Sequence, residues 1–431
     1  MPAPKALLAA LQQVVAMFIG CITPALIFIS VVELAPEMQR YLISMSLLTA
    51  GVGTLLQAAR LGPIGSGLLS VNGTSFAYLD LLLRSGSEGG IALACGMTLA
   101  AVPLQFTLAF FLPGMRRLFS PMVAGIVVLL IGLTLIPVAG YYIASPSAEG
   151  EIIWSQNCLL AGVVVGILLL TQILGKPMLR ICGPVLAIAI GYAIASLFGL
   201  LQWPDVGEGN WLIVPEPLKA GLAFKWELLL PFAIIYLVSS IESIGDLSAT
   251  ASLSGMETTG ERFWKRLRGG IFSDAIASTL AALISAFPTS TFSQNNGVIQ
   301  LTGVGSRQVG FYVAGILILC ALLPQTGVFF SMIPKPVLGG VTLLLFGLIA
   351  GAGLRMINQV PIGSKEVLVL AISLGMAFGI PSQDALVESL PPLLRGVLSS
   401  SVATGGLTAV IMNLVYLRKG EPAELVHEEG I

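Results

Sequence analysis

Long apolar runs separated by short polar connections are the dominant pattern of the chain. A helix needs roughly 20 apolar residues to cross a bilayer. Fourteen runs approach that length, at residues 6–31, 42–59, 63–83, 90–113, 119–141, 157–175, 181–202, 226–252, 269–287, 288–304, 308–323, 331–353, 363–381 and 395–417. The pattern predicts an all-α polytopic membrane protein with about 14 transmembrane segments.

The positive charges predict the orientation of these segments. If the N-terminus lies inside and the spans alternate, only six of the 21 Lys and Arg residues lie outside, namely Arg40, Arg84, Lys219, Lys225, Lys335 and Arg395. Because Lys and Arg accumulate on the cytoplasmic side, this distribution predicts that both termini are cytoplasmic. The polar stretch 203–225, with Trp203 and Trp211, then forms an outside loop between two halves of about seven spans each.

Two segments at matching positions of the two halves are unusually polar. Residues 62–80 and 285–303 are both dense in Gly, Pro, Ser, Thr and Asn, and the runs Thr74-Ser75-Phe76 and Thr289-Ser290-Thr291-Phe292 resemble each other. Seven spans are an odd number, so the two halves must be inverted relative to each other. Paired interrupted segments in inverted halves indicate the binding site of a transporter. We expect a short extended stretch followed by a half-helix in each, with free N–H groups directed at the substrate.

The composition supports a membrane protein and excludes other classes. The chain is 56% hydrophobic and only 10% charged, whereas soluble domains carry about 25% charged residues. Its net charge of −1 and the absence of a basic run give no footprint for nucleic acid. The only histidine is His427, and no CxxC spacing occurs among the five cysteines. A histidine-based metal site or catalytic triad is therefore excluded, no cofactor is expected, and an intramembrane enzyme is disfavoured.

Three acids lie inside apolar runs without a cationic neighbour in the sequence. Glu242 and Asp246 are four residues apart, which places them on one face of the eighth span. Asp274 lies near the start of the ninth. A carboxylate at mid-bilayer costs roughly 2.5–3.5 kcal/mol on insertion scales, and burial favours its neutral form. We interpret the three acids as substrate anchors and proton carriers, although capping of broken helices or exposure to a wet vestibule also fits Asp246 and Asp274.

Amides and aromatic rings accompany these acids. Gln294, Asn295 and Asn296 form a run of three amides, each of which offers both donors and acceptors. A planar heterocycle with N–H and C=O edges needs that complement, with Glu242 accepting from ring N–H groups. Phe76 and Phe292 are positioned to stack on a ring, although packing is the commoner role of a lone Phe. A polar planar small molecule is the substrate class that these residues favour.

The chain resembles the nucleobase–ascorbate transporter family, also called nucleobase:cation symporter family 2. The stretch Gln294–Gly303 matches the family signature Q/E/P-N-x-G-x-x-x-x-T-R/K/G at every defined position, and Ile241–Thr250 resembles a second landmark of the family. The spacing of Glu242, Asp274 and Gln294, together with Ser75 and Phe76, is similar to that of its xanthine and urate branch. The resemblance covers nearly the whole chain.

The resemblance implies a seven-plus-seven inverted fold with short antiparallel strands in spans 3 and 10. It implies core-domain spans 1–4 and 8–11 at residues 1–113 and 226–325, gate-domain spans 5–7 and 12–14 at residues 114–225 and 326–417, and a cytoplasmic tail at 418–431. It also implies a homodimer in the bacterial inner membrane, in contact with lipid, with H⁺ as the coupling ion.

The resemblance further implies roles for individual residues. Glu242 and Gln294 would hold a nucleobase by side chain, with Ser75, Phe76, Phe292 and Asn295 contributing, and Asp246, Asp274 and Glu242 would support proton coupling. Within the family, Gln294 and Asp246 resemble the purine branch, whereas uracil carriers typically show Glu and His at these positions.

One departure from the family bears on the substrate. Many purine members carry a histidine in span 1, where this chain has Gln13, so the particular base stays open. Ser400 and Val402 match substrate-filtering positions of the last span. A proton-coupled purine symporter of the xanthine or urate type, working by alternating access, is the interpretation that results. The alternatives are a uracil or other pyrimidine symporter of the same fold, or an anion transporter or channel that shares the architecture.

Overall fold

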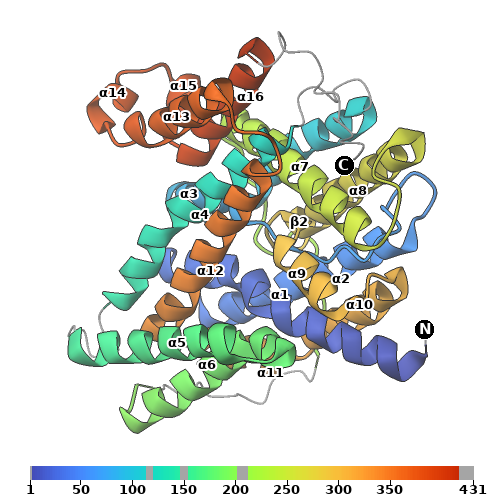
Figure 1. The fold of residues 1–431 in the computed structure, drawn as a ribbon. Coiled ribbons are helices and arrows are strands. Elements are labelled where there is room, and N and C mark those ends of the chain that lie inside the picture. Colours follow the sequence, from blue (N-terminus) through green and yellow to red (C-terminus); the bar gives the residue numbers. More distant parts are fainter. Residues whose placement is uncertain (1, 113–119, 146–153, 201–211, 417–431) are drawn as a thin grey trace.

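The computed structural model describes residues 2–112, 120–145, 154–200 and 212–416 (Figure 1). The predicted tail at 418–431, the boundary at 113/114, and Trp203 and Trp211 of the predicted outside loop lie outside the described residues. The first half contains α1 (Ala3–Val31), α2 (Pro36–Ala59), β1 (Asn72–Thr74), the 3₁₀ helix η1 (Phe76–Tyr78), α3 (Leu79–Phe111), α4 (Pro121–Ile143), α5 (Trp154–Leu174) and α6 (Pro177–Leu197).

The second half also places a short strand after two helices. It contains α7 (Trp226–Leu253), α8 (Gly260–Leu283), β2 (Thr289–Thr291), α9 (Ser293–Thr302), α10 (Arg307–Leu322), α11 (Pro324–Ser331), α12 (Lys335–Ile357), α13 (Ser364–Gly379), α14 (Asp384–Glu388), α15 (Pro392–Leu398) and α16 (Ser401–Tyr416). Proline occupies the first or second position of several helices, where its missing N–H has no intrahelical acceptor to lose. These helices are α1, α2, α4, α6, α11, α12 and α15.

Eight helices in the described part of the chain are long and apolar enough to cross a membrane, or nine if the bent pair α10 and α11 counts as one span. The prediction of fourteen spans is larger because several predicted spans fall on short or broken helices. α3 combines two of them in 33 residues, and its backbone breaks at Gly89 and Gly90, where Gly90 has a φ of 67°. α9 has only 10 residues, and α13 and α16 have 16 each. The number fourteen therefore stays a prediction.

Two groups of helices pack around different centres. α4 and α12 run alongside each other between the α5–α6 pair and the α13–α16 pair (Figure 1). The α4–α12 contact is close because both helices place glycines in it: a Cβ at Gly132 would lie 2.4 Å from the Ala350 backbone nitrogen, and one at Gly353 would lie 2.3 Å from that of Leu129. Small residues let the backbones of membrane helices approach in this way.

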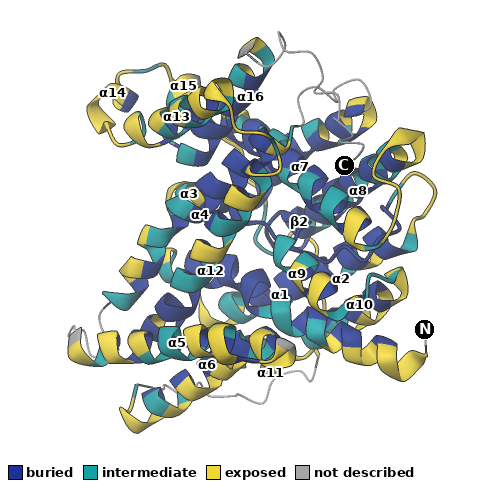
Figure 2. Cartoon of the chain, viewed as in Figure 1, coloured by how far each residue is buried: buried dark blue, intermediate teal, exposed yellow. Residues whose placement is uncertain are grey.

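The second group surrounds the two strands. α2 packs against α10 and α3 against α8, while α1 contacts β1, α7 contacts β2, and α9 packs against α1 and α7. Burial is highest around β2 and α7, whereas α5 and α6 show long exposed faces (Figure 2). The exposed side chains of α5 include Leu170, Ile173 and Leu174. An apolar face that is exposed in this way is suited to lipid.

Candidate functional site

β1 and β2 form a two-stranded antiparallel ladder in the interior of the second group. Asn72 pairs with Thr291, Gly73 with Ser290, and Thr74 with Thr289, and all six residues of the strands are buried. Backbone bonds from Ser75 N–H to Pro288 (2.9 Å) and from Phe292 N–H to Val71 (3.0 Å) extend the ladder at both ends. The two polar segments that the sequence singles out therefore meet directly, and the backbone at this depth is satisfied by their pairing.

Each strand leads into a helix. β1 is followed by η1 and α3, and β2 is followed by α9. Phe292 precedes α9 without capping it by a side chain, so the first N–H groups of α9 have no side-chain acceptor there. The Phe292 ring packs on β1 because residue 73 is glycine: a Cβ at Gly73 would lie 2.6 Å from the ring. A larger residue at this position would displace Phe292.

Asp274 is fully buried on α8 and both of its carboxyl oxygens are occupied. Oδ1 accepts from Asn72 Nδ2 (2.7 Å) and Gln57 Nε2 (3.0 Å), and Oδ2 accepts from Ser243 Oγ (2.7 Å). The donors come from α2, β1 and α7, so one carboxyl joins four elements. A buried carboxyl with three donors has the partners that its burial requires.

Asp246 ties α7 to the start of α9. Its Oδ1 accepts from Ser293 Oγ (2.6 Å) and its Oδ2 from Thr291 Oγ1 (3.1 Å). Glu242 lies about one helical turn away on α7, about 6 Å along the axis, and Gln294 directly follows Ser293. Through the Asp246–Ser293 bond, Glu242 and Gln294 are therefore held in the same region, where α7 packs against α9.

Glu242 and Gln294 each carry a buried polar atom without a hydrogen-bond partner among the described residues. These atoms are Glu242 Oε2 and Gln294 Nε2. The Gln294 amide lies against α1, where a Cβ at Gly20 would lie 2.8 Å from Nε2. Most buried polar groups in native proteins are paired. An unpaired acceptor and an unpaired donor in the same region are the groups that a polar ligand can satisfy.

The other two amides of the run have protein partners. Asn295 Nδ2 donates to the Gln13 side-chain oxygen (2.6 Å) and backbone oxygen (3.0 Å) on α1. Asn296 accepts from Thr250 Oγ1 (2.6 Å) and donates to the backbone oxygen of Asp246 (3.2 Å). The three amides therefore point to different neighbours. Asn295 keeps one buried oxygen without a partner, while its donors hold α9 to α1.

Ser75 and Phe76 lie where β1 passes into η1. The Ser75 hydroxyl is buried and has no hydrogen-bond partner within the described part of the chain. Phe76 is 8% exposed and its ring meets Phe346 of α12 edge to face, with 5.6 Å between the centroids. Phe76 therefore joins the strand region to the α4–α12 group.

Several residues of the site could not be singled out by sequence reasoning. Gln57, Asn72 and Ser243 hold Asp274, and Ser293 and Thr291 hold Asp246. Gln57 carries a usable signal, because a buried amide in an apolar span is costly unless it has a partner. Among the described residues, no group of three or more His, Cys, Asp or Glu side chains is arranged to hold a metal ion.

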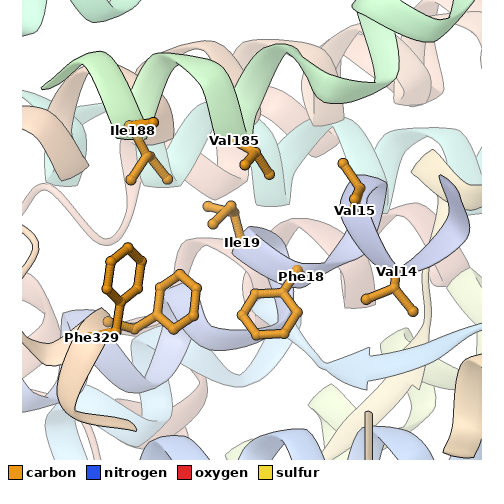
Figure 3. Close-up of a pocket in the computed structure, with 9 residues that line it drawn as sticks. Val14, Val15, Phe18, Ile19, Val185, Ile188 and Phe329 are labelled. Atoms are coloured by element: carbon orange, nitrogen blue, oxygen red, sulfur yellow. The ribbon is translucent and has the colours of Figure 1, made fainter. Parts of the chain in front are cut away.

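A separate cavity of about 200 Å³ lies between α1, α6 and α11 (Figure 3). Its walls are apolar and include Val14, Phe18, Val185, Ile188 and Phe329. It offers no polar group to orient a polar ligand. The region around the paired strands β1 and β2, called the strand crossing below, is therefore the candidate site, and this cavity is not.

Comparisons with known proteins place the chain in a family. The sequence model of the Permease family, Xan_ur_permease, matches residues 4–386. The protein named xanthine permease XanP of Escherichia coli K12 is 39% identical over 433 residues, covering 96% of this chain and 92% of the relative. Xanthine permease XanQ of the same strain is 34% identical over 434 residues, covering 96% and 91%. Uric acid permease PucJ of Bacillus subtilis is 33% identical over 414 residues, covering 94% and 91%.

Solved structures resemble the fold. The transmembrane domain of the cyanobacterial bicarbonate transporter BicA matches with a TM-score of 0.58 at 16% identity, over 94% of this chain and 96% of that one. The murine anion transporter Slc26a9 matches with a TM-score of 0.63 at 15% identity, over 96% and 68%. At these identities the likeness concerns the fold alone.

The fold and the matches define a membrane-spanning transporter, and the named relatives are permeases, not enzymes. The chain belongs to the Permease family of the Xan_ur_permease model, that is, to the nucleobase–ascorbate transporters that its motifs resemble.

Proposed function

We propose that the chain is a proton-coupled symporter for a purine base of the xanthine or uric acid type, working by alternating access. The printed names of its relatives support the substrate class. The observation that carries the proposal is the pair of unpartnered atoms, Glu242 Oε2 and Gln294 Nε2, beside the crossing of β1 and β2.

The purine binds where these two atoms lie. Glu242 accepts from a ring N–H, and the Gln294 amide donates to a ring carbonyl or nitrogen while its oxygen accepts from the neighbouring N–H. Phe76 and Phe292 cover the ring, and the free Ser75 hydroxyl contributes a further contact. The first N–H groups of α9, which the Phe292 side chain does not cap, add donors, and Asn295 holds that start in place through Gln13.

Glu242 carries the transported proton in this proposal. Both oxygens of Asp274 and both of Asp246 accept from protein donors, whereas Glu242 Oε2 has no donor among the described residues. A buried carboxylate oxygen without a donor has nothing to replace its lost hydration. Protonation of Glu242 therefore accompanies movement of the occupied site across the membrane, while Asp246 and Asp274 position α7, α8 and α9 around it.

We propose the fourteen-span, seven-plus-seven inverted arrangement with its strands in spans 3 and 10. The contacts between helices support it. When each element is replaced by the equivalent element of the other half, one contacting pair becomes another. α2 with α10 corresponds to α8 with α3, and α5 with α6 corresponds to α13 with α16. α4 with α12 and β1 with β2 each pair equivalent elements of the two halves.

The same packing supports a core domain at 1–113 and 226–325 and a gate domain at 114–225 and 326–417. The main helix contacts between them are those of α7 with α4, α15 and α16, of α1 with α6 and of α2 with α11. Phe76 and Phe346 meet across this boundary. The substrate therefore lies between the domains, and their relative movement exposes it to either side. Following the family, we propose a homodimer in the bacterial inner membrane with cytoplasmic termini.

Uptake by reconstituted protein tests the substrate class. Proteoliposomes containing the full chain should accumulate radiolabelled xanthine under an inward proton gradient, and unlabelled uric acid or xanthine should compete. Uracil and bicarbonate should compete weakly. Equal competition by uracil would favour the pyrimidine alternative, and inhibition by bicarbonate alone would favour an anion transporter of this architecture.

A further inference from the structure

A second cavity, of about 450 Å³, opens at the far end of α9 from Gln294. Its walls come from the segment before β1, the end of α7 and the turn between α9 and α10, and include Gly67, Ser254, Gly303 and Arg307. Gly303 lies nine residues after Gln294, about 13 Å along α9. The cavity is therefore separate from the proposed purine site, and its volume falls within the roughly 300–1,000 Å³ typical of small-molecule sites.

Three arginines lie at or beside this cavity. Arg307 lines it directly. Arg60 and Arg266 lie beside Gly67, which is one of the lining residues: the position of a Cβ on Gly67 lies 3.1 Å from Arg60 Cδ and 3.6 Å from Arg266 Nη1. The Arg266 guanidinium donates to the Ser66 backbone oxygen at 3.3 Å, which directs it toward the same wall.

These arginines differ from their neighbours in having no carboxylate partner. Among the described residues, Arg262 pairs with Glu257 and Lys265 with Glu261, both close by on or before α8, but no ion pair includes Arg60, Arg266 or Arg307. Partial burial lowers the pKa of the Arg266 guanidinium from its usual value, and the charges of Arg60 and Arg307 lower it further, against the opposing effect of Glu257. The three cations therefore repel one another.

Other features of the cavity also suit an anion. α10 begins at Arg307, so the positive end of its dipole faces the cavity. The Ser254 hydroxyl oxygen, at the cavity wall, is buried and has no hydrogen-bond partner in the ranges that the structure describes. Guanidinium groups present paired donors that match phosphate oxygens two at a time, and Arg is the usual residue of phosphate recognition.

We propose that this cavity binds a phosphate-bearing ligand, held by Arg60, Arg266 and Arg307. The phosphate neutralises three otherwise unpaired charges, and the rest of the cavity receives the part of the ligand attached to it. In the proposed topology this face is cytoplasmic. The phosphate can belong to a soluble metabolite or to the headgroup of an anionic lipid, and both sources offer the same chemistry.

Two titrations of the purified full chain separate these sources. In neutral detergent, inorganic phosphate and a nucleoside monophosphate are titrated while the thermal unfolding midpoint and binding heat are measured. In parallel, the protein is placed in nanodiscs of phosphatidylcholine alone or with phosphatidylglycerol, and its unfolding midpoint is compared. A ligand that binds only the folded protein raises this midpoint.

Arg307→Gln and Arg266→Gln are the test variants, and Lys265→Gln, which removes the same charge from the same face, is the matched control. We expect each arginine variant to weaken phosphate binding, or the stabilisation by phosphatidylglycerol, by about tenfold or more in affinity. Lys265→Gln should change it by less than about twofold. Loss of the soluble phosphate effect identifies a metabolite site, and loss of the phosphatidylglycerol effect alone identifies a lipid site.

Folding of the variants is checked without any anion. Removing one of three repelling cations should leave the unfolding midpoint unchanged or raise it, so a variant that fails to bind is not simply misfolded. The proposal is overturned if neither phosphate nor phosphatidylglycerol stabilises the wild-type protein, or if Lys265→Gln weakens the effect as much as Arg307→Gln does.

Discussion

The Asn295 side chain donates to Gln13 of α1 twice, to its side-chain oxygen at 2.6 Å and its backbone oxygen at 3.0 Å. Gln13 is 1% exposed, so this contact holds the start of α9, and with it Gln294, against α1. Many purine members of the family carry histidine at this position. In this chain the contact with Asn295 gives Gln13 a structural role there.

Replacing Gln13 should therefore disturb α9 from a distance. Gln13→Ala leaves the Asn295 donor buried with one acceptor fewer, a cost of about 1–3 kcal/mol, and we expect a lower unfolding midpoint and a higher KM for xanthine uptake. Gln13→His supplies a ring nitrogen as acceptor and should keep uptake near that of the wild type. Gln12→Ala is the control; equal effects of the two alanine variants would contradict the role given to Gln13.

Glu242→Gln should abolish active uptake while the protein still inserts and folds. The amide has nearly the same shape but neither binds a proton nor carries a negative charge to a ring N–H. The measurement is xanthine uptake together with the monodispersity of the purified variant. Glu257→Gln, at a site with a 59% exposed side chain, should transport normally. Wild-type uptake by Glu242→Gln would remove the main substrate anchor.

Gln294→Glu should change which base is recognised more than it changes expression. The change removes the unpaired Nε2 donor and adds a negative charge beside Glu242, so we expect xanthine affinity to fall by about tenfold or more. The same change at the exposed Gln300 of α9 is the control. Competition of labelled xanthine by xanthine, uric acid and uracil measures the preference, and an unaltered order of competitors would contradict the pairing proposed for Gln294.

Gly73→Ala should destabilise the strand crossing because its Cβ would lie 2.6 Å from the Phe292 ring. Overpacking of this kind costs about 1–3 kcal/mol. Phe292→Leu shortens the opposing side chain, so the double variant should unfold at a higher temperature than Gly73→Ala alone. Gly315→Ala, on α10 with no atom within 4 Å of the new Cβ, serves as the control. Strict additivity of the two changes would show that the ring and residue 73 do not interact.

The two polar segments were recognisable in the sequence because their Gly, Ser, Thr and Asn content conflicts with the apolar runs around them. β1 and β2 lie within those segments, and Glu242, Asp246 and Asp274 lie on α7 and α8, close to them. The partners of these acids were not recognisable. Asp274 accepts hydrogen bonds from Gln57 and Asn72, which lie more than 200 positions earlier in the chain. The hydrophobic periodicity of a sequence carries no information on contacts between residues so far apart.

The amide run shows the same limit on a smaller scale. Three consecutive side chains on a helix point about 100° apart, so they cannot all face one ligand. The structure turns Asn295 to Gln13 and Asn296 to Thr250, and leaves Gln294 Nε2 unpaired. Helical geometry alone predicts that the three side chains point in different directions. Which of them has a protein partner follows only from the packing of α1 and α7 around α9.

The most direct test of the central claim is the movement of protons driven by xanthine. Proteoliposomes containing the full chain and a trapped pH-sensitive dye are given external xanthine with no imposed gradient. Acidification of the lumen that depends on xanthine, and that disappears in Glu242→Gln, is the predicted result. Entry of xanthine at the same rate without any acidification, or acidification that survives Glu242→Gln, would contradict a purine symporter that loads its proton on Glu242.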